Sequence, residues 1–190
     1  MASVLQAAFI GGATGPWAVT AVTAVRGEGL PPVPALDRYE GQTPPAAAPA
    51  GPGRWVLRGT ISNERYVERA ERERLVARQE GLGRPEATCA ALIPIAKSAD
   101  WWVLAQDERR ALIEDRSHHI AIGLDYLPAV ARRLHHGRDL GEPFDFLTWF
   151  EFGPADTGAF DELVGRLRET EEWSFVEREV DIRLTRAPAP

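Results

Sequence analysis

The sequence predicts an α+β fold, in which helices cover one face of an antiparallel sheet. Its 190 residues, of which 44% are hydrophobic, are enough to bury a substantial core. Short segments of β-forming residues are separated by segments with helical spacing of apolar residues. From residue 88 onward the expected order is strand, strand, helices, strand, helix, strand, which segregates the helices from the sheet. A split β-α-β arrangement of the ferredoxin-like type fits this order.

The first part of the chain predicts fewer elements. Residues 17–25, WAVTAVTAV, are rich in β-forming residues and predict a strand. Residues 27–53 are rich in Pro and Gly and predict a long connection. RWVLRGTI at 54–61 predicts a second strand, and the charged segment 63–80 predicts a helix with a partial apolar face. We expect residues 1–86 to form a truncated copy of the half that follows, although no convincing sequence repeat supports this.

The second part begins with TCAALIPIA at 88–96, which predicts a buried strand, and DWWVL at 100–104, which predicts a short one. Residues 107–115 predict a short helix with acidic residues at its start. Apolar residues at spacings of three and four predict a helix over 119–136. Pro128 lies inside this helix and predicts either a kink or the start of a second helix.

The last elements complete the second unit. FDFLTWFEF at 144–152 alternates and predicts a strand. Asp156 can cap a helix that runs to about residue 169, and 173–184 predict the final strand. We therefore expect residues 87–186 to form a complete ferredoxin-like domain.

Composition excludes several classes of protein. A net charge of −6 without a basic cluster argues against nucleic acid as the main partner. A single cysteine, Cys89, excludes a disulfide within the chain. The N-terminal residues lack a basic segment followed by a sustained apolar core, so we expect no secretory signal, no membrane span and a cytoplasmic location. Lys97 is the only lysine among 22 basic residues, which suggests a position that arginine cannot fill.

All four histidines lie within residues 115–136, as two adjacent pairs. Neighbours on a helix point to different sides, and the spacings of known zinc motifs are missing, so a zinc site is disfavoured. A single axial histidine, as in many haem proteins, needs no such partners. It does need an acceptor for its second ring nitrogen, for which carboxylates at 168–173 are candidates. The alternative is that each histidine is a partly exposed helix residue.

Four segments resemble the chlorite dismutase family in order and spacing. They are WVLRGTISNERY, LIPIAKSADWWVL, HIAIGLDYLPAVARRLHHGRDLGEPFDFLTWFEF and LRETEEWSFVEREVDIRL, and FIGGATGPWAV near the start matches as well. The resemblance covers roughly residues 54–186. The short length resembles the small branch of the family, whose members are homodimers. The resemblance to the family implies a ferredoxin-like C-terminal half that binds haem b and a shorter N-terminal half beside it.

The resemblance also implies roles for individual residues. The proximal iron ligand is His119, the acceptor behind it is Glu172, and Lys97 belongs to the same hydrogen-bond network. The distal arginine is Arg132. Further positions that line or approach the cofactor are Gln79, Leu127, Trp149, Asn63 and Tyr66. Ordinary positions on the helix surface or at dimer contacts are expected for His118, Arg133, His135 and His136.

The implied activity is decomposition of chlorite to chloride and dioxygen. The guanidinium of Arg132 would bind chlorite and retain hypochlorite until the two oxygen atoms are joined. His119 and Arg132 would be about 20 Å apart on one straight helix, so the segment must bend, and Pro128 is the expected hinge. A coproheme decarboxylase is a rival on the same fold, but the segment ALIPIAK lacks the reactive tyrosine of that enzyme. A haem-binding stress protein without chlorite turnover is the other alternative.

Overall fold

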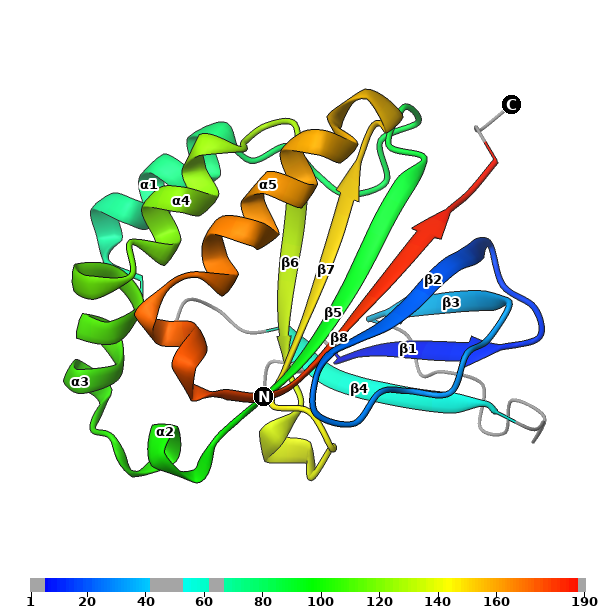
Figure 1. Ribbon diagram of the computed structural model, residues 1–190. Coiled ribbons are helices and arrows are strands. Elements are labelled where there is room, and N and C mark those ends of the chain that lie inside the picture. The colour runs from blue at the N-terminus through cyan, green and yellow to red at the C-terminus, as the bar shows by residue number, and fades with distance from the viewer. Residues whose placement is uncertain (1–5, 42–52, 62–66, 188–190) are drawn as a thin grey trace.

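Eight strands of the described chain pair into one closed antiparallel barrel (Figure 1). The computed structural model describes residues 6–41, 53–61 and 67–187. Around the barrel the strands follow the order β1-β3-β2-β8-β5-β7-β6-β4, and β4 pairs again with β1. The strands are β1 (Gln6–Gly12), β2 (Trp17–Arg26), β3 (Ala35–Glu40), β4 (Trp55–Ile61), β5 (Cys89–Lys97), β6 (Ala131–His136), β7 (Phe146–Phe152) and β8 (Val176–Thr185).

The expectation of open ferredoxin-like sheets is wrong. Two seams join the N-terminal and C-terminal strands into one sheet that closes on itself. Along one seam β2 pairs with β8, from Ala18 opposite Thr185 to Arg26 opposite Glu179. Along the other β4 pairs with β6, where Thr60 lies opposite His136. Closure pairs the edge strands that open sheets would leave exposed, which removes their unsatisfied backbone groups.

The two strands that sequence patterns missed, β1 and β3, are needed for this closure. β1 pairs with both β3 and β4 along its length. Its sequence, QAAFIGG, is composed mainly of small residues, and β3, ALDRYE, lacks a clear alternation of apolar and polar residues. Strand pairing therefore overrides weak local preference in this part of the chain.

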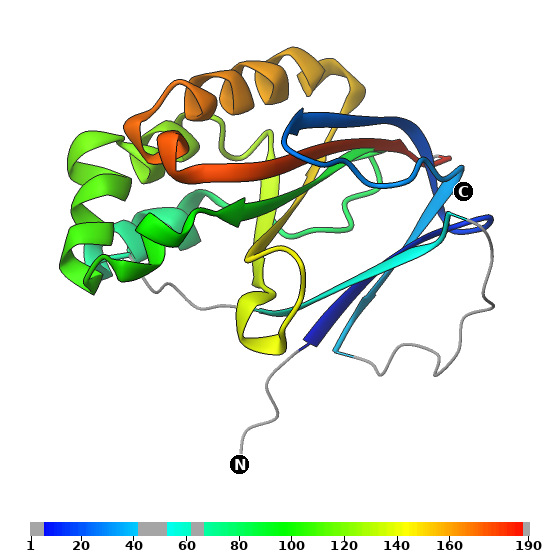
Figure 2. The ribbon, with the colours of Figure 1, turned by 60° about the horizontal axis from the view of Figure 1, so that its bottom comes forward.

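The helices lie against the strands of the C-terminal half, as Figures 1 and 2 show from two directions. Residues 6–41 and 53–61 contribute strands but no helix. The α-helices are α1 (Arg69–Arg78), α2 (Ala99–Val103), α3 (Gln106–Arg110), α4 (His119–Asp125) and α5 (Thr157–Arg168). Shorter helical segments are the π-helix Ala111–Arg116 and the 3-10 helices Arg138–Leu140, Pro154–Asp156 and Glu171–Phe175.

Two segments have a secondary structure that differs from the one expected. Residues 119–136 do not form one kinked helix, because α4 ends at Asp125 and the chain continues after Pro128 as strand β6. A proline disfavours helical continuation, and the following residues pair with β7 along six positions. The segment 100–104 lies mostly in helix α2, not in a strand. Both errors arise where tertiary packing overrides a local pattern.

Apolar side chains fill one layer inside the barrel and one under the helices, and a third cluster, around Trp101, lies among the shorter helices. Alternation along β7 assigns its residues to these layers. Leu147 and Trp149 belong to the cluster inside the barrel, which includes Phe9 from β1 on the other side. Phe146 and Phe150 belong to the cluster that packs against α5. The space between the helices and the outer face of β5, β7 and β6 is where the candidate site lies.

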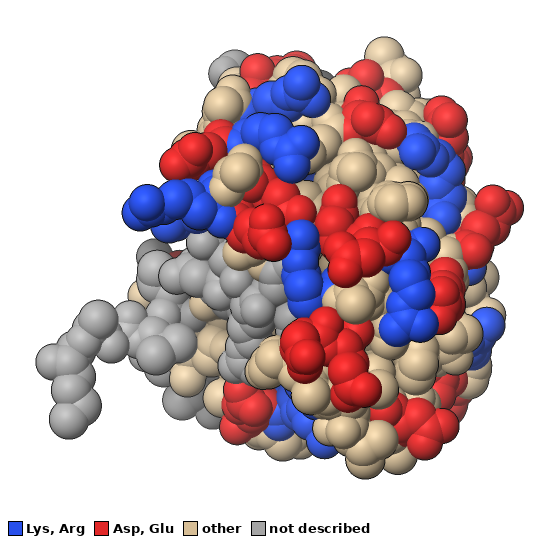
Figure 3. Space-filling model, turned by 90° about the vertical axis from the view of Figure 1, so that its left-hand side faces the viewer, with Lys and Arg blue, Asp and Glu red and all other residues tan. Residues whose placement is uncertain are grey.

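Charges of both signs are mixed on the face that carries α1, α3 and α4, where Figure 3 shows Lys and Arg interspersed with Asp and Glu. Several of these charges are paired, as in Arg110 with Glu71 at 2.6 Å and Arg116 with Glu171 at 2.9 Å. Along the described ranges, no helix is long and apolar enough to cross a membrane.

Candidate active site

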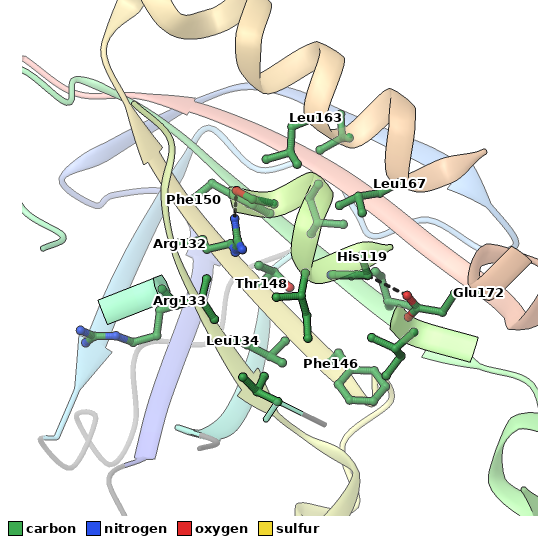
Figure 4. A pocket seen from close by; sticks show the side chains of 18 of the residues that line it. His119, Arg132, Arg133, Leu134, Phe146, Thr148, Phe150, Leu163, Leu167 and Glu172 are labelled. Atoms are coloured by element: carbon green, nitrogen blue, oxygen red, sulfur yellow. Dashed lines mark hydrogen bonds and ion pairs between the residues drawn. The ribbon is translucent and has the colours of Figure 1, made fainter. Parts of the chain in front are cut away.

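A cavity of about 550 Å³ lies between the helices and the outer face of the barrel (Figure 4). This volume is within the range of about 300–1,000 Å³ that is typical of ligand and cofactor sites. Helices α1, α4 and α5 and strands β5, β6 and β7 contribute to its wall. Apolar side chains of this wall include Leu75, Ile93, Ile95, Leu134, Phe146, Phe150, Leu163 and Leu167.

His119 is the first residue of α4, and its imidazole lines this cavity. Two features fix its backbone. His118 adopts a left-handed conformation with φ 52°, which turns the chain sharply after the π-helix Ala111–Arg116. The Glu114 carboxylate then accepts a hydrogen bond from the backbone N–H of Ile120 at 2.7 Å. A carboxylate at this position satisfies a free donor of the helix N-terminus and favours its partial positive charge.

The imidazole is held from behind by a buried carboxylate. Glu172 Oε2 lies 2.7 Å from Nδ1 of His119, and Glu172 Oε1 accepts a hydrogen bond from Nζ of Lys97 at 2.9 Å. The side chains of Glu172 and Lys97 are 7% and 3% exposed, whereas that of His119 is 33% exposed toward the cavity. This arrangement occupies Nδ1 and leaves Nε2 as the ring nitrogen available for a ligand.

Glu172 remains ionised in spite of its burial. Burial by itself raises the pKa of its carboxyl, but His119 and Lys97 outweigh burial and lower the pKa to about 2. The pKa of Lys97 is lowered by burial, and the carboxylate of Glu172 opposes this shift. The buried carboxylate of Glu172 thus has one oxygen directed at the imidazole of His119 and the other at the ammonium of Lys97.

Aromatic rings and one hydroxyl keep this network in place. Nζ of Lys97 lies 4.4 Å from the ring centroid of Trp101 and 5.5 Å from that of Trp173. The Trp173 ring is stacked on His119 at 6.3 Å between centroids. Ser117 Oγ accepts a hydrogen bond from the backbone N–H of Glu172 at 2.9 Å. The ammonium of Lys97 is a compact point charge that meets one carboxylate oxygen beside these rings, whereas a guanidinium would present a planar set of donors.

Arg132 lines the same cavity from strand β6. Across the ladder with β7 it lies opposite Phe150, whereas Arg133 lies opposite Trp149, so the two arginines occupy opposite faces. Nη1 of Arg132 donates to the backbone carbonyl of Gly123 on α4 at 2.9 Å. No carboxylate of the described residues forms an ion pair with it, and burial lowers its pKa to about 10.

Only some of the other residues expected near the cofactor line the cavity. Gln79 lines the cavity, and its Nε2 donates to the backbone carbonyl of Arg132 at 2.8 Å. Leu127 lies outside the lining, in a buried cluster with Trp101. Trp149 points into the barrel, away from the cavity, and its Nε1 donates to Glu151 at 2.8 Å. The two remaining residues, Asn63 and Tyr66, lie outside the described residues.

The four residues expected on a helix surface or at dimer contacts do not lie on one helix. His118 is exposed at the start of α4. Arg133 borders the cavity and forms an ion pair with Glu40 of β3. His135 and His136 are buried on β6, with exposed fractions of 0% and 4%, and only His136 lines the cavity. The expectation that His135 and His136 lie on a helix surface is therefore wrong, because this segment is a strand, and the alternative of dimer contacts stays a prediction.

Sequence reasoning missed several cavity residues. Leu134, Phe146, Thr148 and Phe150 line the cavity because they alternate with inward-facing neighbours on β6 and β7. Correct assignment of residues 131–136 as a strand would have revealed this alternation. Gly123 also lines the cavity, one turn of α4 after His119.

The residues present fit a planar cofactor that is held by one axial ligand. A half-exposed imidazole faces an apolar cavity, and the helix face next to it carries a glycine without a side chain at position 123. An ideal Cβ at Gly123 would lie within 2.8 Å of three atoms of the Arg132 guanidinium, so the glycine leaves the space that this guanidinium occupies at the cavity wall. Fold and site together define an α+β barrel protein with a pocket in which one lining histidine, His119, is backed by a buried carboxylate.

The sequence profile described as chlorite dismutase matches residues 53–187, and the chain belongs to this family. A chlorite dismutase from Ideonella dechloratans is 36% identical over 83 residues, which are 44% of this chain and 27% of that protein. The chain therefore matches only about a quarter of the length of this curated relative.

Solved structures extend the similarity over most of the chain. The crystal structure of a dimeric chlorite dismutase from Nitrobacter winogradskyi is 56% identical, covers 95% of this chain and 99% of its own, and has a TM-score of 0.86. A chlorite dismutase from Candidatus Nitrospira defluvii in complex with imidazole is 28% identical, covers 70% of this chain and 55% of its own, and has a TM-score of 0.57. Family membership thus agrees with the resemblance found in the sequence.

Proposed function

We propose that this protein binds haem b and decomposes chlorite to chloride and dioxygen. The observation that carries the proposal is the placement of His119 and Arg132 on one apolar cavity, from α4 and β6 respectively. His119 has a carboxylate behind it, and Arg132 has no carboxylate partner among the described residues. The similarity to chlorite dismutases supports the same activity.

His119 would hold the iron through Nε2. When bound, haem supplies the redox chemistry that breaks the two chlorine–oxygen bonds and joins the oxygen atoms. Glu172 would accept a hydrogen bond from Nδ1–H of His119, which would fix the tautomer and increase the electron donation of the ring. Lys97 compensates the charge of this carboxylate, so the network adds little net charge behind the ligand.

Arg132 would bind chlorite on the open side of the cofactor. Its guanidinium presents several donors in a plane and remains charged, which suits a small oxyanion. The apolar side chains around it exclude water, and exclusion of water strengthens the interaction between the guanidinium and an anion. The same guanidinium would retain hypochlorite until dioxygen has formed.

The cavity favours this activity over coproheme decarboxylation. The β5 residues that line it are Ile93, Ile95 and Lys97, and none of them is a tyrosine. A decarboxylase of the related type uses a reactive tyrosine on this strand. We also propose that the protein is a homodimer, because the Nitrobacter winogradskyi protein, which this chain covers almost completely, is described as dimeric.

A haem titration followed by an oxygen measurement tests the proposal. The purified chain should bind one haem per protomer with a Soret band, and the loaded protein should release one dioxygen per chlorite consumed. A protein that binds haem but releases no dioxygen would be a haem-binding protein without this activity. Light scattering should give the mass of two chains, and a monomer would contradict the proposed dimer.

A further inference from the structure

Two consecutive residues of one short helical segment contact His119 on different sides. The 3-10 helix Glu171–Phe175 places Glu172 at the edge of the imidazole, where its Oε2 lies 2.7 Å from Nδ1 (Figure 4). Trp173 lies against the face of the same ring, at 6.3 Å between centroids and with an interplanar angle of 26°. Aromatic pairs interact at centroid distances of about 4.5–7 Å. The hydrogen bond fixes one atom of the imidazole, and the ring on its face limits tilting of its plane.

The indole of Trp173 is itself held by a second buried carboxylate. Its Nε1 donates to Oε2 of Glu179 on β8 at 2.8 Å, and Glu179 is 1% exposed. The other oxygen, Oε1, accepts a hydrogen bond from Nε of Arg168 at 2.8 Å. Arg168 is the last residue of α5 and also pairs with Asp181 at 3.0 Å. Hydrogen bonds to a charged group are about twice as strong as those between neutral groups, so this carboxylate holds the indole edge firmly.

The two buried carboxylates reach the imidazole by different routes. Glu172 contacts His119 directly and pairs with Lys97. Among the hydrogen bonds of the described residues, those of the Glu179 side chain go to Arg168 and Trp173, and none goes to His119. The chain of contacts from Glu179 to the imidazole therefore runs through the indole.

The backbone of Trp173 is anchored from the N-terminal part of the chain. Nη1 of Arg26, at the end of β2, donates to the carbonyl of Trp173 at 3.0 Å and to that of Val176 at 2.6 Å. With the backbone held in this way, rotation about the side-chain bonds is the main freedom that the indole retains. The hydrogen bond to Glu179 is the polar contact that restrains this rotation.

We propose that Trp173 is a positioning residue for His119, and that Glu179, held by Arg168, keeps its indole against the face of the imidazole. The orientation of the ring toward a haem rests on the proposed function, whereas the contact itself is present without the cofactor. A fixed imidazole plane presents Nε2 in one direction, and such preorganisation reduces the cost of ordering when a ligand binds. His119 is thus oriented before a cofactor enters the cavity.

The resonances of the His119 ring in the haem-free full chain test this contact. Selective labelling of the four histidines gives one signal for each, and His119→Ala identifies the signal of His119. An aromatic face shifts nearby resonances upfield, so Trp173→Leu should move the signal downfield. Glu179→Leu removes the acceptor of the indole and should move the signal in the same direction. Glu179→Gln keeps an acceptor oxygen and should stay closer to the parent.

The double variant shows whether Glu179 acts through the indole. In the Trp173→Leu background, Glu179→Leu should cause no further shift of the His119 signal. A parental signal in Glu179→Leu would overturn the proposal, and so would an equal shift with and without the indole, because the carboxylate would then act by another route. Glu177→Leu is the control, since Glu177 is an exposed residue of the same strand, and it should leave the signal unchanged.

Electron paramagnetic resonance of the ferric haem-loaded protein tests the orientation of the ligand. The rhombic splitting of the high-spin signal depends on the direction of the axial imidazole plane. Trp173→Leu should change or broaden this splitting, and Glu177→Leu should match the parent. An identical splitting in Trp173→Leu and the parent would overturn the proposal, and this result does not depend on the folding of Glu179→Leu. A protein that binds no haem would leave the histidine resonances as a complete test, so this proposal and the proposed function fail independently.

Discussion

Glu172 lies between His119 and Lys97, with one carboxylate oxygen 2.7 Å from the imidazole Nδ1 and the other 2.9 Å from the ammonium. The carboxylate is almost fully buried, so both contacts operate with little screening by water. A ligand imidazole that donates to an anion is a stronger electron donor than one that donates to a neutral group. The electronic properties of a metal at His119 should therefore depend on Glu172.

Substitution Glu172→Gln should raise the ferric/ferrous potential of the haem-loaded protein. A charge-assisted hydrogen bond contributes about 1.5–3 kcal/mol, which corresponds to roughly 60–130 mV for a one-electron couple as an upper limit. Spectroelectrochemical titration measures this shift. Glu171→Gln is the matched control, because Glu171 is half-exposed and pairs with Arg116. A potential that is equal in the parent and in Glu172→Gln would place Glu172 outside the ligand network.

Substitution Lys97→Met should destabilise the protein by leaving Glu172 buried without its cation. Loss of one partner of a buried ion pair costs about 3–5 kcal/mol. The double variant Lys97→Met with Glu172→Gln should be less destabilised than Lys97→Met alone, since no uncompensated charge remains. Chemical denaturation measures both free energies of unfolding. Additive effects of the two substitutions would show that the pair is not coupled.

Substitution His119→Ala should abolish or severely weaken haem retention, because no other imidazole takes its place next to Glu172. The control is His118→Gly, since position 118 is exposed and has φ 52°, a conformation that glycine adopts without strain. Absorbance of the Soret band after gel filtration measures retention. Loss of haem in His118→Gly with retention in His119→Ala would reverse the assignment.

Substitution Arg132→Ala should raise the Michaelis constant for chlorite and shorten the lifetime of the protein during turnover. Hypochlorite that is no longer retained would destroy the haem, so a hypochlorite scavenger should protect this variant more than the parent. Arg132→Lys keeps the charge but loses the planar set of donors, so it should recover affinity better than lifetime. The number of turnovers before inactivation is the quantity to measure.

Arg133→Ala is the matched control for these experiments. Arg133 is adjacent in sequence and borders the cavity, but it lies opposite Trp149 and its guanidinium pairs with Glu40, so its loss should change the Michaelis constant less than the loss of Arg132 does. Parental kinetics and lifetime in Arg132→Ala would show that Arg132 does not act on chlorite.

Local patterns predicted the strands that alternate clearly and the helix that ends near residue 169. They could not predict closure of the barrel, because closure depends on β1 and β3, which have weak β patterns and pair with strands distant in sequence. The segment 131–136 was assigned to a helix because its apolar spacing fits one, whereas its pairing with β7 makes it a strand. Periodicity over a few residues cannot decide between these outcomes.

The sequence was more informative about the site than about the fold. Family resemblance selected His119, Glu172, Lys97 and Arg132, and the structure brings all four to one cavity. It also selected Trp149, which alternation along β7 directs into the barrel. A motif fixes the position of a residue in the chain, but the face of a strand on which it lies depends on register, and one step changes the face. The cytoplasmic location stays a prediction.

The origin of the oxygen atoms in the product tests the central claim most directly. A mixture of chlorite labelled with oxygen-18 and unlabelled chlorite is given to the haem-loaded protein, and the dioxygen is analysed by mass spectrometry. If both oxygen atoms of one chlorite are joined within the cavity while Arg132 retains hypochlorite, the product contains fully labelled and unlabelled dioxygen and no mixed species. Mixed dioxygen, or oxygen taken from water, would contradict the account.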